Sequence, residues 1–326
     1  MILIKQRLKK RLKQTYTKLS HRFGLMPKKK KISYSIARSF CNSYSDIERI
    51  YSRNNIVFRL NYSSYSKILK IYDAERKNNL NKELFVINKI LNKDIPAPII
   101  ECVDHEGKEF GLPYIVMISS GNKTLSSIKN RSVTSAIPLF IQMGYYFAMI
   151  HNINLDLEKN TDVKLNMFKP NWDDLKQDFI FSIKYLMKHN LIDITDGTWC
   201  LSVINILPKF NGSSLCHGDF NCTQCIIDND RISAICDWED STITDPVYDF
   251  LTHHVFLDIF CHPILKKCFW SEYINFKPLP NNYKARYLSF RVLYLLLLIE
   301  IFHKCNNITL VKKGLILFKK YKKEFV

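Results

Sequence analysis

The spacing of apolar residues in 56–118 changes along the chain and indicates, in order, two strands, a helix and two further strands. This order restricts the fold more than any other feature of the chain. Apolar residues alternate in IVFRL (56–60) and SKILKIY (66–72), whereas they recur at helical spacing in KNNLNKELFVINKILNK (77–93). Residues 94–118 return to a strand, a turn containing Gly107 and Gly111, and a second strand. The sequence therefore predicts a small antiparallel sheet with one helix.

Beyond residue 121 the pattern is mainly helical, most clearly in residues 137–153 and 172–189. The apolar run at 292–299 predicts a buried helix, and only LCHGDFNCTQCIIDNDRISAICDWED (215–240) interrupts the helical pattern, as a loop followed by a short hairpin. With 47% hydrophobic residues, a chain of 326 residues can form a large core. We expect an α+β fold in three parts: a basic N-terminal helix and linker (1–45), an N-lobe with the sheet (46–120) and a helical C-lobe (121–326).

Positive charge is concentrated at the two ends of the chain. The net charge of +18 divides into +13 in residues 1–45, −4 in residues 46–250 and +9 in residues 251–326. Apolar residues at spacings of four and three among the lysines and arginines of residues 1–23 predict a basic amphipathic helix. We expect residues 1–31 to bind an anionic membrane surface; a helix packed on the body with a solvated charged face explains the pattern equally well. Nucleic acid is the less favoured partner.

The sequence predicts a cytoplasmic protein that is peripheral at the membrane if its basic N-terminus binds there. No run of 18 uncharged apolar residues occurs, and the N-terminus lacks the pattern of a secretory signal. We expect the ten cysteines to stay reduced.

Charged and amide side chains recur in an order that suits phosphoryl transfer. Lys70 lies on the second predicted strand, and Glu83 lies in the helix that follows. Asp219, Gln224 and Asp237 come later, around the interrupting segment. Phosphoryl transfer needs a cation on the nucleotide phosphates, a carboxylate to hold that cation, a carboxylate to orient the attacking hydroxyl, and oxygen ligands for magnesium. The five residues supply this set.

These motifs resemble the aminoglycoside phosphotransferase and choline kinase group, relatives of protein kinases that phosphorylate small molecules. The resemblance covers about residues 48–255 and is carried by HGDFNCTQ (217–224), ICDWED (235–240), DPVYDF (245–250), PYIVMISSG (113–121) and YYFAMIH (145–151). It implies a two-lobed, protein-kinase-like fold, a small-molecule kinase activity, and ATP and Mg²⁺ as cofactors.

The resemblance also implies roles for individual residues. Asp219 would be the catalytic base, and Asp237 and Gln224 would bind magnesium. Lys70 would hold the phosphates of ATP, with Glu83 holding its ammonium group. Further residues would bind the nucleotide or support the site: Asn55 before the first strand, Met117, Ile118 and Ser119 in the connector between the lobes, and His217 and Asp249 as structural members of the catalytic loop.

Two positions depart from the family pattern. Gln224 stands where the family usually has Asn, so the ligand oxygen lies one methylene further from the backbone. The turn IYSRNN (50–55) has no glycine, which makes close backbone approach to phosphates harder. A kinase-fold binding protein without turnover, recruited by its basic tail, is therefore the competing interpretation.

Cys222 and Cys225 form a C-x-x-C pattern near Cys216 and His217, which raises zinc or redox chemistry as another interpretation. A second pair at the usual spacing is missing. We favour a packing role for these cysteines.

The acceptor hydroxyl is predicted from charge. A polycationic aminoglycoside needs an acidic pocket, whereas residues 251–326 carry +9. We therefore expect a sugar or a glycan- or lipid-linked hydroxyl compound. Choline or ethanolamine is the alternative, because Trp172, Asp173, Asp174 and Asp178 could form an aromatic and acidic cage.

Overall fold

The computed structural model describes residues 36–40, 46–50, 52, 55–73, 76–109, 111–127, 132–155, 168, 172–207, 212–279 and 283–325. The described residues form two compact units. Of the described residues, those from 36 to 146 and from 222 to 241 form the sheet unit, and those from 147 to 221 and from 242 to 325 form the helical unit. The predicted basic helix and its membrane contact at residues 1–31 lie outside the described residues, and the division at 45/46 and 120/121 stays a prediction.

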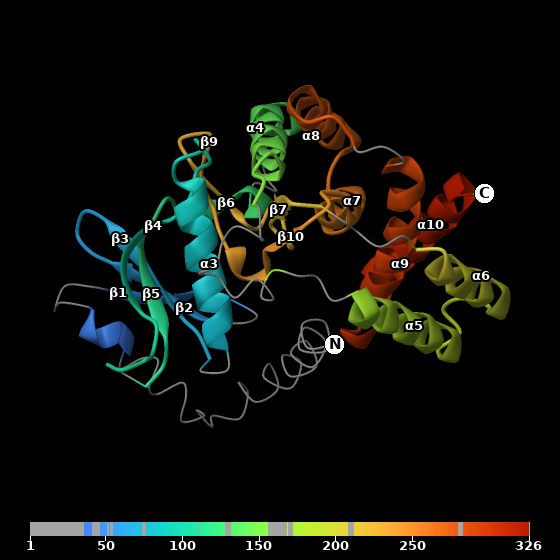
Figure 1. The fold of residues 1–326 in the computed structure, drawn as a ribbon, viewed down its shortest axis with the longest axis horizontal. Helices are drawn as coiled ribbons and strands as arrows, with labels where there is room; N and C mark the ends of the chain where they lie inside the picture. The colour runs from blue at the N-terminus through green and yellow to red at the C-terminus, as the bar shows by residue number, and fades with distance from the viewer. Residues whose placement is uncertain are drawn as a thin grey trace. The chain divides into compact units, whose positions relative to one another are not determined.

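The sheet unit contains a five-stranded antiparallel sheet in the order β1-β2-β3-β5-β4 (Figure 1). The four predicted strands are confirmed as β2 (Ile56–Asn61), β3 (Ser66–Ile71), β4 (Ile99–Asp104) and β5 (Tyr114–Ile118). The fifth strand, β1 (Asp46–Ile50), pairs with β2 along its whole length. Its sequence DIERI is largely charged and its residues are exposed or half-buried, so the hydrophobic pattern gave no signal for it.

Both faces of this sheet are covered, and the alternation of side chains along β5 shows how. Ile115 and Met117 pack with Leu80 and Leu84 of α3 (Lys77–Ile90), the predicted helix. Tyr114 and Val116 point to the opposite face and pack with Phe58, Leu69 and Ile36. Strands buried on both faces need apolar residues at consecutive positions, as YIVM in β5 provides.

The sheet unit also contains a second, smaller sheet, which is formed mainly by the segment after residue 222. It consists of β6 (Lys123–Thr124), β8 (Cys225–Asp228) and β9 (Arg231–Ile235), and the 3-10 helices η2 (Leu125–Ser127) and η4 (Trp238–Asp240) lie beside it in sequence. Asn229 and Asp230 turn the β8–β9 hairpin with positive φ angles of 45° and 60°, which Asn and Asp tolerate better than other side chains. The predicted short hairpin is thus confirmed, and it delivers the chain to Asp237.

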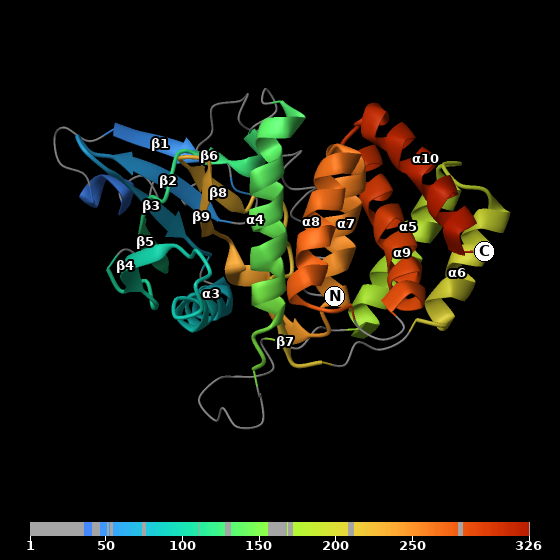
Figure 2. The same cartoon turned by 90° about the horizontal axis from the view of Figure 1, so that it is seen from above.

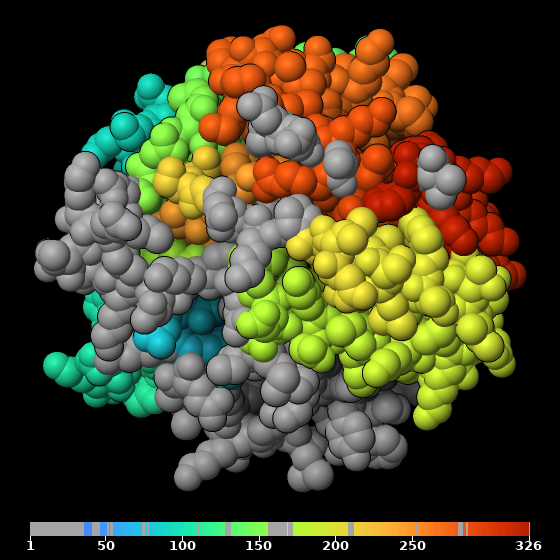
Figure 3. Space-filling view, turned by 45° about the vertical axis from the view of Figure 1, so that its right-hand side comes forward, coloured from blue at the N-terminus to red at the C-terminus, as the bar shows by residue number. Residues whose placement is uncertain are grey.

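The helical unit is built around α9 (Tyr283–Lys304), which confirms the buried helix predicted at 292–299. Leu293, Leu295, Leu296 and Ile299 are fully buried. Against α9 pack α5 (Trp172–Lys188), α6 (Ile194–Asn205), α7 (Val247–Phe260) and α10 (Ile308–Phe325), and α8 (Pro263–Phe276) packs on α7 (Figure 2). The atoms of α5 and α6 adjoin on one face of the unit (Figure 3). The short strands β7 (Ser214–Cys216) and β10 (Thr242–Thr244) pair antiparallel.

Helix α4 (Val133–His151) is, among the described residues, the one helix long and apolar enough to cross a membrane. In the helical unit Phe147 stacks on Phe220 at 4.7 Å between ring centroids, and in the sheet unit Gln142 accepts a hydrogen bond from the backbone of Ile232.

Three buried histidines make the stability of the helical unit dependent on pH. Burial lowers the pKa of His253 to about 3, and it also lowers the pKa of His151 and of His254. In the unfolded chain these imidazoles take up protons near pH 6.5, so the unfolded state binds more protons between about pH 6.5 and pH 3. The free energy of unfolding therefore falls as the pH falls through this window.

We predict that His253→Asn weakens this dependence. The Asn amide nitrogen is at the position of Nδ1 in the side chain and can still donate to the carbonyl of Phe220, which lies 3.0 Å from His253 Nδ1. Without the imidazole, the unfolded state takes up one proton fewer relative to the folded state. The factor by which the unfolding equilibrium constant changes per pH unit should therefore be smaller than in the wild type, by up to about tenfold. Urea unfolding at pH 7, 6 and 5 measures both slopes. Equal slopes for the two proteins would contradict the assignment of a neutral buried His253.

Candidate active site

Lys70 lies at the centre of the polar cluster of the sheet unit. Its Cα pairs with Ile115 and Val57 in the middle of the five-stranded sheet, and only 5% of the residue is exposed. Lys70 Nζ lies 2.6 Å from Glu83 Oε2 and 2.8 Å from Asp237 Oδ1. Burial alone would lower the pKa of this ammonium group, but Asp237 and Glu83 outweigh that effect and raise the pKa well above its usual value. Lys70 is therefore a permanent cation held by two carboxylates.

Glu83 comes from the second turn of α3 and is almost completely buried. Burial raises the pKa of this carboxyl group, and the charge of Lys70 offsets part of the rise. Tyr72 donates a second hydrogen bond of 2.6 Å to Glu83 Oε2. Helix α3 is also tied to the segment after Asp237, because Lys82 donates to the carbonyl of Ser241 at 2.8 Å. These contacts fix the helix that carries Glu83 against the end of β9.

Asp237 follows the apolar strand β9 and adopts a left-handed conformation with φ of 70°. The preceding backbone is held by Ile235 N, which donates to Pro96 O at 2.8 Å, and by Cys236 N, which donates to Gln224 O at 2.9 Å. The Asp237 side chain is 42% exposed, and Lys70 contacts its Oδ1. Oδ2 is the carboxylate oxygen that remains for a cation. An oxygen of this kind suits Mg²⁺.

Glu239 was not selected as a site residue from the sequence, yet it connects several candidate residues. Only 1% of it is exposed. Its Oε2 accepts a 2.7 Å hydrogen bond from Asn55 Nδ2 and lies 3.9 Å from Lys70 Nζ, and its Oε1 lies 3.2 Å from Arg76 NH1. The signal was present in the motif ICDWED, where Glu239 follows Asp237 by two residues. Its role needs tertiary contacts, because Asn55 lies 184 positions away.

Asn55 therefore has one end of its amide engaged. With Nδ2 donated to Glu239, the buried Oδ1 has no hydrogen bond within the described residues. The amide oxygen carries partial negative charge and cannot donate a hydrogen bond, so it is a poor ligand for a phosphate. The arrangement favours a role for Asn55 in holding the turn before β2, and not as a direct phosphate ligand.

Gln224, the predicted magnesium ligand, lies at the start of the β8–β9 hairpin and is 8% exposed. Its side-chain oxygen Oε1 accepts a short hydrogen bond from the hydroxyl of Thr223. This oxygen keeps a second lone pair that a metal could use. Gln224 and Asp237 belong to the same unit, and the Cys236 N to Gln224 O hydrogen bond joins their backbones.

The predicted connector begins at the end of β5. Met117 is buried on the α3 side of the sheet, and Ile118 is 43% exposed. Ser119 N donates to Ser66 O at 3.0 Å, which extends the β3–β5 pairing beyond the last strand residue. Arg59 on β2 donates through NH2 to the carbonyl of Gly121 at 3.2 Å. This hydrogen bond ties the segment that follows β5 to β2.

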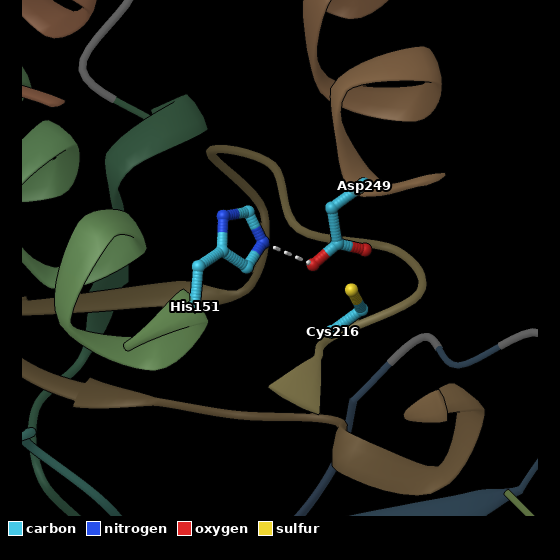
Figure 4. Close-up of side chains that lie close together, drawn as sticks. All are labelled: His151, Cys216 and Asp249. Atoms are coloured by element: carbon cyan, nitrogen blue, oxygen red, sulfur yellow. Dashed lines mark hydrogen bonds and ion pairs between the residues drawn. The ribbon is translucent and has the colours of Figure 1, made fainter. Parts of the chain in front are cut away.

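The helical unit carries a second group of candidate residues, in the loop after β7. Asp249 of α7 accepts backbone N–H groups of His217 at 2.6 Å and of Gly218 at 2.7 Å. Its Oδ2 also lies 3.1 Å from His151 Nε2, and Figure 4 shows His151 and Asp249 facing each other beside Cys216. Asp249 was expected to support the catalytic loop, and its contacts are those of a loop anchor.

His151, Cys216 and Asp249 are ligand types that bind metals, and their ligand atoms lie within 4.8 Å of one another. Each is already engaged in the protein. His151 Nδ1 lies 3.0 Å from Tyr273 OH, and the Cys216 thiol contacts the carbonyls of Ser214 and Asp245 at 3.8 and 3.6 Å. Burial raises the pKa of Cys216 and lowers the pKa of His151, so neutral side chains are favoured. We assign this group to loop support.

Asp219 stands in the loop that Asp249 holds. It is half-buried, its backbone N–H donates to His217 Nδ1 at 3.4 Å, and its carbonyl accepts from Asn221 Nδ2 at 2.9 Å. His217 is fully buried. The neighbouring Phe220 stacks on Phe147, and its carbonyl lies 3.0 Å from His253 Nδ1. Apolar packing and hydrogen bonds together hold the backbone on both sides of the Asp219 carboxylate.

The two cysteines of the C-x-x-C pattern are buried in the sheet unit. Cys222 is 3% exposed and Cys225 is fully buried. Burial raises the pKa of the Cys225 thiol, which disfavours the thiolate that metal binding or redox exchange needs. This environment is typical of packing residues.

Comparison with known proteins identifies the family of the chain. A family model described as the phosphotransferase enzyme family matches residues 47–268. No curated protein matches the chain. Among solved structures, the chain is similar to the GDP and kanamycin complex of APH(2″)-IIIa (13% identity, TM-score 0.63, covering 90% of this chain and 100% of that one).

The chain is also similar to the gentamicin complex of APH(2″)-IIa (15% identity, TM-score 0.57, covering 89% of this chain and 95% of that one). A thermostable APH(4)-Ia mutant with ADP and hygromycin B matches as well (15% identity, TM-score 0.55, covering 89% of this chain and 96% of that one). At such low identity the likeness shows the fold. The predicted α+β, protein-kinase-like fold class is confirmed.

We predict that breaking the buried pair of Lys70 and Glu83 is strongly destabilising. Glu83→Gln removes the more deeply buried of the two carboxylates that contact Lys70, and breaking a buried pair typically costs a few kcal/mol, about 3–5 in strongly buried cases. The matched control is Glu101→Gln, which breaks the half-exposed pair of Glu101 and Lys67, where Nζ and Oε1 are 2.5 Å apart. That change should cost less than about 1 kcal/mol. Chemical denaturation at pH 7 measures both, and equal losses would contradict the prediction.

Proposed function

Since the chain belongs to the phosphotransferase enzyme family, which confirms the prediction of a small-molecule kinase, we propose that it transfers the terminal phosphoryl group of ATP to a hydroxyl of a sugar or of a glycan- or lipid-linked compound. The observation that carries the proposal is the pairing of buried Lys70 with Glu83 and Asp237 at 2.6 and 2.8 Å. A cation held in this way, with one partly exposed carboxylate, suits the phosphates of a nucleotide and their metal.

The sheet unit would bind the nucleotide. Lys70 would contact the phosphates in place of Asp237. Glu83 would then keep the Lys70 ammonium group in position. Met117, Ile118 and Ser119 would lie against the base. Structures similar to this chain hold ADP or GDP, which supports a purine nucleotide in general.

Asp237 and Gln224 would hold Mg²⁺, since both present oxygen atoms from adjacent backbone segments of one unit. When bound, the ion would neutralise charge on the phosphates. Asp219 would orient the acceptor hydroxyl and accept its proton, and the anchoring of its loop by Asp249 would keep the carboxylate in one position. His217 would support the same loop.

The acceptor proposal rests on charge. Similar structures bind kanamycin and gentamicin, whereas residues 251–326 of this chain carry +9, which disfavours a polycationic acceptor and favours a neutral or anionic one. The predicted acidic cage of α5 is divided over the helix. At about 100° per residue, Asp174 and Asp178 share one side, while Trp172 and Asp173 point elsewhere. Asp178 is buried, so it is poorly placed for a choline headgroup.

We predict that Asp219→Asn lowers kcat by about 10²-fold or more, while nucleotide affinity changes little, because the amide cannot accept the hydroxyl proton. The control is Asp228→Asn at the exposed end of β8, which should leave kcat unchanged. ADP release coupled to phosphorylation of a hydroxyl panel measures kcat, and a thermal shift with nucleotide measures binding. If wild type and Asp219→Asn are alike in every assay, the chain is a binding protein without turnover.

We predict that Gln224→Ala raises the Mg²⁺ concentration needed for half-maximal activity, because it removes a ligand oxygen. Gln224→Asn should retain more activity, since it keeps the amide one methylene closer to the backbone. Activity titrated with Mg²⁺ separates the two variants from the wild type. If Gln224→Ala matches the wild type, the side chain is not a metal ligand.

The acceptor class is tested with purified protein, ATP and a panel containing neutral sugars, anionic sugar phosphates, choline, ethanolamine and kanamycin. We expect turnover of sugars and little turnover of kanamycin. Turnover of choline alone would reject the sugar proposal and support the alternative substrate. Replacing ATP with GTP in the same assay identifies the nucleotide.

A further inference from the structure

The outward face of the C-terminal helix α10 carries an unusual concentration of lysines without counter-charges. Lys312, Lys319, Lys320 and Lys323 are all exposed. Within the part of the chain that the structure describes, none of the four forms a hydrogen bond or an ion pair through its side chain. By contrast, Lys322 on the flank of the helix pairs with Asp196 at 2.5 Å, and Lys313 donates to the carbonyl of Ile259.

An exposed isoleucine lies in the middle of these charges. Ile316 is 71% exposed, the largest exposure of any apolar side chain on α10. At about 100° per residue, Lys312, Lys319 and Lys323 lie on one side of Ile316 and Lys320 lies on the other. The stretch from Lys312 to Lys323 is roughly 16 Å long at 1.5 Å per residue. We call these four lysines and Ile316 the α10 outer face.

The opposite face of α10 is fixed to the helical unit. Val311, Gly314, Phe318 and Tyr321 are buried, and α10 packs along α9 (Figure 2). The guanidinium group of Arg291 on α9 lies 3.6 Å from the Tyr321 ring centroid and also pairs with Glu324. Phe318 and Phe325 contact Trp199 of α6. The α10 outer face is thus held on a rigid helix and does not depend on folding at the moment of contact.

The combination favours a lipid surface over nucleic acid. Clustered lysines are attracted to either anionic surface. An isoleucine among them gains nothing from a phosphate backbone in water, whereas the boundary between lipid head groups and acyl chains accepts both the apolar side chain and the lysine stems around it. A helix of ordinary solvated character would be expected to intersperse acidic residues with the lysines, whereas α10 has one acidic residue, Glu324, and it pairs with Arg291.

We propose that the α10 outer face binds the surface of a bilayer that contains anionic lipids. This surface would attach the protein through its folded helical unit, separately from any contribution of residues 1–31. Binding depends on charge and on one apolar side chain, so it is reversible and weakens as salt screens the lysines.

The test uses the full chain and vesicles of phosphatidylcholine, with or without phosphatidylglycerol. The quadruple variant Lys312→Gln, Lys319→Gln, Lys320→Gln, Lys323→Gln is compared with a control of equal charge change, Lys93→Gln, Lys108→Gln, Lys184→Gln, Lys188→Gln, whose lysines are exposed elsewhere. Both proteins keep residues 1–31, so a difference between them belongs to α10. Circular dichroism checks that both are folded.

We expect the α10 variant to lose partitioning onto phosphatidylglycerol vesicles by on the order of 10²-fold, at roughly fivefold per lysine with incomplete additivity. The control should lose much less. Ile316→Ser should lower partitioning several-fold, whereas Ile99→Ser, at an exposed isoleucine of β4, should not. Equal losses in the two quadruple variants would overturn the proposal. So would a loss of duplex DNA binding by the α10 variant with vesicle binding retained, which would assign the surface to nucleic acid.

Discussion

The buried ammonium group of Lys70 is the constraint on which the sheet unit depends. A charge in the interior of a sheet is tolerated only with partners, and Glu83 and Asp237 supply them at 2.6 and 2.8 Å. Glu83 must come from α3, and Asp237 must come from the end of β9. The cation thereby requires the first hairpin, the helix and the returning segment 222–241 to fold as one unit.

Glu239 extends the same constraint to the turn before β2. Its carboxylate contacts Asn55 in that turn, Arg76 at the start of α3, and Lys70, which we expect to contact the nucleotide phosphates. One buried anion therefore holds these three segments before any nucleotide arrives. In the helical unit, Asp249 has an equivalent place, since it accepts two backbone N–H groups of the loop that carries Asp219. In each unit, the candidate residues are therefore held by a buried carboxylate to which we assign a positioning role.

Most of the elements could be predicted from local patterns. The alternation in residues 56–72, the helical spacing in 77–93 and the apolar run at 292–299 each correspond to an observed element, because burial of one face imposes a period that local sequence reveals. β1 escaped this reasoning because an edge strand with exposed charged residues needs no apolar period. The motifs HGDFNCTQ and ICDWED identified the candidate residues, but the role of Glu239 in the second motif could not be predicted, because its partners Asn55 and Arg76 lie far away in the sequence.

The sequence by itself determined the kinds of elements, the family motifs and the separation of basic ends from a slightly acidic middle. Only the tertiary structure decided which charges meet. Lys70 contacts Glu83, 13 positions away, and Asp237, 167 positions away. Asn55 contacts Glu239, 184 positions away. The same holds for α10. Its lysines are visible in the sequence, but which of them are neutralised by carboxylates depends on neighbouring helices, since ion pairs form between surfaces that packing brings together.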